Sequence, residues 1–304
     1  MQEVKKLYAD VQIFPEKDKI TVKNRRLFKD LSDLTFALTV EQEGLCLEKQ
    51  ILDVCAGPEQ TVTIPIRIKN VPENDEYTIT VSACLKQDSL YAPAGYEVAF
   101  GQTVLNHFSP KLPSLKGRPF KVVYGDVNIS AIGGDFSAMF SRGEGGLISL
   151  VYRGTEYITR TPKLSFFRAA TDNDKGMGAP AKDCGWLAAS AGLRYAPESF
   201  TVREMESSLE VSVEYEAMYP EKFRCKICYT IDASGTLKIR ADYPSISGEN
   251  FMPLFAMDFK LKKSLDHFSY YGLGPEENYS DRKQGARLGV FERRGTANLS
   301  RYLI

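Results

Sequence analysis

Acidic and amide side chains crowd into one short segment, residues 166–178 (FFRAATDNDKGMG). The four polar residues of interest share a stretch of seven positions and are Arg168, Asp172, Asn173 and Asp174. Oxygen ligands at this density suit sugar hydroxyls or a cation, but counting from Asp172 the calcium-loop template fails at its fifth and sixth positions, Gly176 and Met177. The alternative is an Asx-type turn in which Arg168 neutralises an aspartate.

A second polar cluster occupies residues 270–289 (YYGLGPEENYSDRKQGARLG), where GLGP forces a turn. Its polar members are Glu276, Glu277, Asn278, Asp281 and Arg282. Paired carboxylates are the catalytic groups of glycosidases. Glu276 and Glu277 are adjacent on an irregular segment and point in different directions, and no feature of the sequence indicates a raised pKa for either. A structural turn is therefore the favoured interpretation.

Other residue types that support catalysis or metal binding are isolated. His107 and His267 are far apart and fit no metal-ligand spacing. Cys225 and Cys228 form one C-x-x-C, but FRCKICYTI is a predicted strand, so the two thiols face opposite sides of a sheet. The glycine-rich run at 141–150 lacks the Lys-Ser/Thr of a phosphate loop and is explained by a hairpin turn. The sequence predicts no catalytic residue and no metal ligand in this chain.

Composition excludes several classes of protein. The 304 residues include 39 Lys+Arg and 39 Asp+Glu, a balance that argues against nucleic-acid or polybasic membrane binding. No apolar run approaches the roughly 20 residues of a membrane span, and the first residues lack a secretory signal. The six cysteines are too few and scattered for a disulfide-stapled scaffold. These features predict a cytoplasmic, reducing setting.

Short runs with period-2 alternation predict an all-β chain. Between residues 7 and 105 about seven such runs with no helical period between them are typical of an immunoglobulin-like β-sandwich. Residues 106–119 carry three prolines and a glycine, and residues 106–118 are a predicted linker. From residue 119 strands resume, and one helix is predicted over 182–193, with Trp186, Leu187 and Ala191 on a shared face. The predicted domains are 1–105 and 119–304, joined by 106–118.

The two polar clusters, in this order and about a hundred residues apart, resemble motifs of one family. RAATDNDKG resembles the R-A-P-x-D-N-D-x-G string of bacterial β-galactosidases of glycoside hydrolase family 2, and GLGPEENYSDR resembles their G-x-G-P-x-E-N-Y-x-D-R string. The segments EVKKLYADVQIFP and ITVKNRRLFKDLSDLTFALTV are similar to the start of the β-sandwich that follows the catalytic barrel. Ala170 and Ser280 stand where proline is usual. The resemblance covers nearly the whole chain.

This resemblance implies an immunoglobulin-like β-sandwich followed by a galactose-mutarotase-like β-supersandwich that is truncated at its C-terminus. The family's catalytic glutamates lie on a barrel that precedes these domains, so the chain is expected to be a non-catalytic C-terminal fragment of a retaining β-galactosidase, inactive alone. Its expected partners are the barrel and other domains of a homo-oligomeric parent, with a galactoside as substrate and neither nucleic acid nor membrane. No cofactor is expected in this fragment, and Mg²⁺ is a candidate cofactor of the parent.

Carried over residue by residue, one segment is similar to the mobile loop that the terminal domain leans over the barrel mouth: Asp172, Asn173, Asp174, Lys175 and Gly176. The resemblance implies that this segment shapes and gates the sugar pocket, with Arg168 holding it by pairing with an aspartate. Two alternatives stay open: a stand-alone carbohydrate-binding module, which needs an exposed aromatic platform, and an accessory subunit of a split β-galactosidase.

Overall fold

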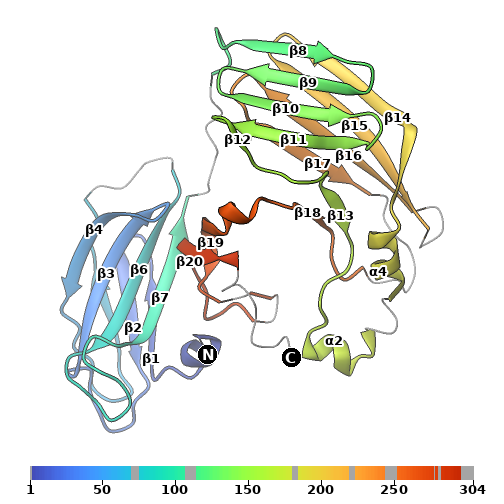
Figure 1. Ribbon diagram of the computed structural model, residues 1–304. Coiled ribbons are helices and arrows are strands. Elements are labelled where there is room, and N and C mark those ends of the chain that lie inside the picture. Colours follow the sequence, from blue (N-terminus) through green and yellow to red (C-terminus); the bar gives the residue numbers. More distant parts are fainter. Residues whose placement is uncertain are drawn as a thin grey trace. The chain divides into compact units, whose positions relative to one another are not determined.

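The computed structural model describes residues 2–69, 75–106, 114–179, 184–218, 223–243, 252–276, 278–279 and 282–295 (Figure 1). Strands dominate these residues, which confirms the predicted all-β class. The chain forms two compact units, one built from residues 1–111 and 267–303 and the other from residues 112–266. Of the predicted linker, residues 107–113, with His107, lie outside the described part.

The first unit contains a seven-stranded antiparallel sandwich. One sheet has the order β1-β2-β5, with β1 Val11–Pro15, β2 Lys19–Asn24 and β5 Thr61–Pro65. The facing sheet has the order β4-β3-β6-β7, with β3 Leu34–Gln42, β4 Leu45–Leu52, β6 Tyr77–Leu85 and β7 Glu97–Leu105. Alternation fills the core between the sheets, where Ile20, Leu38 and Val81 are fully buried. The predicted sandwich is confirmed.

Two elements of this unit escaped the sequence analysis. Helix α1, Gln2–Leu7, precedes β1 and was not predicted; only its last residue falls within residues 7–105, where strands were expected. Strand β4 has no buried residue, so its sequence lacks the apolar alternation on which the prediction depended.

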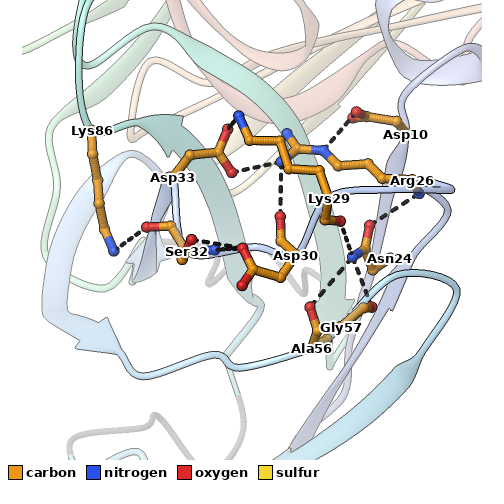
Figure 2. Close-up of polar contacts among 10 residues, drawn as sticks. All are labelled: Asp10, Asn24, Arg26, Lys29, Asp30, Ser32, Asp33, Ala56, Gly57 and Lys86. Carbon is orange, nitrogen blue, oxygen red and sulfur yellow. Dashed lines mark hydrogen bonds and ion pairs between the residues drawn. The ribbon is translucent and has the colours of Figure 1, made fainter.

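A polar network fixes the connection between β2 and β3 (Figure 2). The fully buried Asn24 donates from Nδ2 to the carbonyls of Lys29 (2.9 Å) and Gly57 (2.8 Å), and its Oδ1 accepts from the Arg26 backbone N–H at 3.0 Å. The Arg26 guanidinium binds Asp33 at 2.6 Å and Asp10 at 2.7 Å. Because buried polar groups need partners, this network ties three segments of the sandwich together.

The second unit has two larger sheets that share one core. The five-stranded sheet runs β12-β11-β10-β9-β8, with β8 Phe120–Tyr124, β9 Asn128–Gly133, β10 Phe136–Ser141, β11 Gly146–Tyr152 and β12 Thr155–Glu156. The four-stranded sheet runs β14-β15-β16-β17, with β14 Arg194–Met205, β15 Ser208–Ala217, β16 Phe223–Asp232 and β17 Leu237–Asp242. A small sheet pairs β13 Lys163–Ser165 with β18 Ala256–Asp258.

Helix α4, Cys184–Ala191, covers one end of this core with a different face from the one predicted. Trp186 and Ala189 are buried, whereas Leu187 and Ala191 are exposed, so the predicted shared face is wrong. The Trp186 ring packs edge-on against Phe166 and Phe223. Burial of this ring fixes the rotation of the helix and turns Leu187 toward solvent.

Two local predictions about this unit are confirmed. The glycine-rich run at 141–150 connects β10 to β11 as an antiparallel hairpin. On β16 the Cys225 thiol is buried in the core while Cys228 lies on the opposite face, and burial raises the pKa of Cys225 to about 12. Cys46, Cys55 and Cys84 of the first unit and Cys225 and Cys228 of the second form no disulfide.

A 3-10 helix, η1 Lys263–Leu265, leads to a last hairpin of β19 His267–Gly274 and β20 Arg287–Arg294. By its contacts this hairpin belongs to the first unit, although the sequence analysis assigned its residues to the second domain.

Candidate functional site

The segment after Phe166 forms a short helix, α2 Asp172–Gly176, capped at its start. Thr171 Oγ1 accepts the Asp174 backbone N–H at 3.2 Å, and Asp174 Oδ2 accepts the Thr171 backbone N–H at 2.7 Å. This reciprocal pair is a capping box, which satisfies two backbone donors that a helix start leaves open. The expected Asx-type turn is therefore replaced by one capped helical turn.

Arg168 holds this turn through Asp174. Its guanidinium donates to both carboxylate oxygens of Asp174, at 2.5 Å and 3.3 Å, and its Nε donates to the Pro253 carbonyl at 3.3 Å. The hydrogen bonds from Arg168 and from the Thr171 N–H hold the pKa of Asp174 below its usual value. Arg168 thus pairs with an aspartate, and the capping geometry selects Asp174 as that partner.

The start of the segment is anchored in the core. Phe166 is fully buried, and its backbone N–H donates to Ser190 Oγ on α4 at 2.8 Å. Ser190 Oγ in turn donates to the Trp186 carbonyl at 2.8 Å. The buried Phe166 therefore fixes the backbone two residues before Arg168.

The remaining predicted site residues lie on the solvent side of the turn. The Asp172 and Lys175 side chains are 78% and 57% exposed and form an i,i+3 ion pair at 3.5 Å. Asn173 lies between them in the sequence on the same turn, and a Cβ at Gly176 would meet nothing within 4 Å. The structure therefore places five of the six predicted residues in one turn and binds the sixth, Arg168, to Asp174 of that turn, while Asp172 and Lys175 stay accessible.

The second polar cluster is a structural turn in its described residues. The Asn278 amide donates to the carbonyls of Leu273 (3.1 Å) and Glu276 (3.2 Å), and Tyr279 and Arg282 exchange backbone hydrogen bonds. Burial alone would raise the pKa of Glu276, but polar contacts that include the hydrogen bond from the Gln2 N–H lower it. A glycosidase general acid needs the opposite shift. Glu277 and Asp281 lie outside the described residues.

One charged cluster was missed by sequence reasoning. Glu97 on β7 accepts hydrogen bonds from Ser82 at 2.6 Å, from Lys5 at 3.0 Å and from Arg287 at 3.0 Å. Burial alone would raise the pKa of Glu97, and these donors outweigh it and lower the pKa. The sequence signal for this cluster was Glu97 at the start of the β7 run. That signal does not identify Lys5 and Arg287 as its partners, because both are distant along the chain.

Two further searches were confined to the described part of the chain. No group of three or more His, Cys, Asp or Glu side chains gathers there as a metal site would require. No helix within it has the length and apolar character needed to cross a membrane.

Fold and turn together define an all-β protein of two sandwich-containing units, the second carrying an arginine-anchored acidic turn. Residues 132–304 match the family model described as beta galactosidase small chain, and residues 20–106 match beta-galactosidase domain 4. The chain belongs to the β-galactosidase small-chain family, and the resemblance drawn from its two motifs is confirmed.

Individual relatives agree with this assignment. A β-galactosidase of Clostridium acetobutylicum is 38% identical over 291 residues, which are 96% of this chain and 32% of that protein. A β-galactosidase of Halalkalibacterium halodurans is 37% identical over 308 residues, 100% of this chain and 30% of that protein. A β-galactosidase small subunit of Latilactobacillus sakei is 33% identical over 189 residues, 56% of this chain and 59% of that protein. The chain thus spans about 30% of the length of the first two relatives.

Proposed function

We propose that this chain is the non-catalytic C-terminal part of a retaining β-galactosidase, and that its α2 turn closes over the sugar pocket of the catalytic barrel. The observation that carries the gating proposal is the Arg168–Asp174 anchor. It fixes one side of the turn to the second unit and leaves Asp172 and Lys175 accessible to a neighbouring surface.

The chemistry of the parent enzyme follows from its class. A retaining glycosidase uses two carboxylates about 5 to 5.5 Å apart, one as the nucleophile and the other first as the acid and then as the base. In this proposal both belong to the barrel. This chain contributes the part that excludes water and orients the galactoside, a role that suits a short polar turn attached to a rigid core.

The partners in this proposal are the barrel and other domains of the parent, within a homo-oligomer, and the galactoside itself. No cofactor is assigned to this chain, and Mg²⁺ stays a candidate cofactor of the parent. The six cysteines are too few and too scattered for a disulfide-stapled scaffold, which supports a reducing compartment, and we place the enzyme in the cytoplasm.

The test has two stages. The purified chain is first assayed with a chromogenic β-galactoside, and no turnover is expected. The chain then replaces the matching part of the Clostridium acetobutylicum β-galactosidase, and kcat and KM of the chimera are measured. An active chimera supports the assignment. Turnover by the isolated chain would overturn the proposal that the catalytic carboxylates lie elsewhere.

Gating is tested in the chimera by Asp174→Ala, which releases the turn from Arg168. We expect kcat/KM to fall by about tenfold to a hundredfold, because small displacements of positioning groups weaken transition-state binding. Asp135→Ala is the matched control, since it removes an aspartate from an arginine pair whose side chains are 87% and 61% exposed. Unchanged kcat/KM in the Asp174 variant would reject the gating role and leave the family assignment intact.

Isothermal titration of galactose into the chain separates this proposal from a stand-alone carbohydrate-binding module. No heat of binding is expected from the accessory part alone. Saturable binding would favour the module, and the exposed rings of Phe28 (95%) and Tyr91 (72%) would be the first residues to replace.

A further inference from the structure

The β19–β20 hairpin contacts residues that lie far from it in the sequence, in the sandwich at the start of the chain. It follows the whole of the second unit, yet by its contacts it belongs with the first sandwich (Figure 1). It also lies within residues 132–304, the segment that matches the small-chain family, whereas the sandwich matches domain 4. The contacts are made by side chains and not by strand pairing.

One of these contacts is a charge cluster at Glu97. The Arg287 guanidinium of β20 donates to both carboxylate oxygens of Glu97, at 3.0 Å and 3.3 Å, and Lys5 of α1 donates at 3.0 Å. The Glu97 side chain is only 18% exposed. A bidentate arginine–carboxylate pair with this little exposure is directional and is less screened by solvent than a surface pair.

In a second contact, the Gln102 side chain of β7 bonds the Leu288 backbone of β20 as a neighbouring strand would. The Gln102 amide accepts the Leu288 N–H at 2.7 Å and donates to the Leu288 carbonyl at 2.9 Å. The same amide donates to Thr80 Oγ1 at 3.0 Å, which fixes its orientation. A further bond runs from the Tyr271 hydroxyl to Glu76 at 3.0 Å.

The turn of the hairpin also fits against α1. The buried Gly285 donates its N–H to Glu3 Oε2 at 2.6 Å. A Cβ at Gly285 would lie 2.5 Å from both the Gln2 carbonyl carbon and the Glu3 nitrogen, which are backbone atoms that cannot rotate away. This close approach requires glycine.

We propose that the β19–β20 hairpin is the docking element by which the small-chain segment binds the domain 4 sandwich, and that the surface of Glu97, Gln102 and α1 holds it without a covalent connection. The hairpin supplies Arg287 to the partly buried Glu97, and Gln102 of the sandwich bonds both backbone groups of Leu288. Separation would remove the bidentate partner of Glu97, which would keep only Lys5 and Ser82, and would break both Gln102–Leu288 hydrogen bonds, so it is opposed by more than the loss of apolar contact. The inference goes beyond the proposed function, because it concerns how two segments associate and not which reaction they serve.

The test uses the full chain with the recognition sequence of a site-specific protease inserted within residues 107–113. The purified protein is cut, and the two pieces are analysed by size-exclusion chromatography at about 1 µM, a concentration at which a specific interface of ordinary affinity persists. We expect the pieces to elute together. Separate elution of two folded pieces would overturn the proposal.

Variants assign the association to the hairpin. We expect Arg287→Gln and Gly285→Ala each to raise the Kd between the cut pieces by about tenfold or more. Gly143→Ala is the matched control, because its nearest neighbour would be an ordinary 3.7 Å contact and the same family segment carries it. Circular dichroism of each uncut variant verifies folding. If both hairpin variants bind as tightly as the control, the docking element lies elsewhere and the inference fails, whatever the outcome of the galactosidase assays.

Discussion

Arg26 in the first unit and Arg168 in the second each bind an aspartate that follows six or seven positions later, but their surroundings differ. The Arg26 side chain is 11% exposed, binds two carboxylates and lies beside the fully buried Asn24 (Figure 2). The Arg168 side chain is 28% exposed and binds one carboxylate. An arginine–aspartate pair therefore fixes the whole β2–β3 connection in the first unit, but holds only one side of the α2 turn in the second.

The difference comes from what surrounds each pair. Around Arg26, buried carbonyls and amides have few alternative partners, so the conformation of the connection is strongly specified. Around Arg168 only one carboxylate is bound, and the side chain itself is more exposed to water than that of Arg26. An exposed polar turn held at one point suits contact with another surface, and a buried network suits structural support.

The largest expected effect is that of Asn24→Ala. Its amide bonds to the buried connection would be lost and their backbone partners left unpaired, which we expect to cost about 2 to 4 kcal/mol. Urea unfolding is followed by circular dichroism, which reports both units, and by fluorescence of Trp186, the single tryptophan, which lies in the second. Only the first-unit transition is expected to move. Asn278→Ala, an exposed amide that also donates to two carbonyls, is the control and is expected to change little.

The two arginines themselves form the next comparison. Arg26→Gln is expected to destabilise the first unit by about 2 kcal/mol, because Asp33 is left partly buried beside a lost partner. Arg168→Gln is expected to cost the second unit less, about 1 kcal/mol, because only one carboxylate loses a partner and Asp174 keeps the hydrogen bond from the Thr171 N–H. The same two unfolding probes measure both. Equal losses would show that exposure does not distinguish the pairs.

The pH dependence of unfolding should also distinguish the Arg26 network from the Arg168 pair. Burial alone would raise the pKa of Asp33, but hydrogen bonds from Lys29 and Arg26 outweigh it and lower the pKa, and Asp174 is lowered by Arg168. A depressed folded pKa stabilises above the unfolded value of about 4, and this stability is lost as pH falls through the folded value. We therefore expect both transitions to weaken between about pH 5 and pH 2. Arg26→Gln should flatten this pH dependence in the first unit only, and Arg168→Gln in the second only.

The smallest expected effect is on stability at the accessible side of the α2 turn. Asp172→Asn and Lys175→Gln remove an exposed pair at 3.5 Å and should leave the Trp186 unfolding midpoint unchanged within error. Asp174→Asn, on the anchored side of the same turn, is the positive comparison. A clear loss of stability in the Asp172 variant would show that this side is structural and would argue against a free contact surface.

Local sequence patterns predicted much of the fold. Alternation placed Ile79 and Val81 of β6 in a core and assigned Cys225 and Cys228 to opposite faces, as the structure shows. Strand β4 was missed because its burial pattern contains no fully buried position. On α4 the predicted face was wrong because the packing of Trp186 fixed the rotation of the helix more strongly than its apolar periodicity did.

Part of the candidate site could also be predicted from local sequence patterns. An arginine close in sequence to three acidic or amide residues made an ionic pair predictable. The choice of Asp174 depended on the capping box with Thr171, which turns its carboxylate back toward Arg168. By contrast, the gating role and the domain boundaries stay predictions.

What the sequence by itself determined is local or repeats with a short period: the all-β class, most strands, the turn-forming motifs and the family they belong to. Only the tertiary structure decided that Arg287 meets Glu97, 190 positions away, that Gly285 lies against α1, and that the Asn24 amide bonds backbone groups of Arg26, Lys29 and the distant Gly57. The physical reason is that periodicity records which face of an element avoids water. The partner of a buried charge or amide is chosen by chain segments that fold together from distant positions, and no short-range pattern encodes that distance.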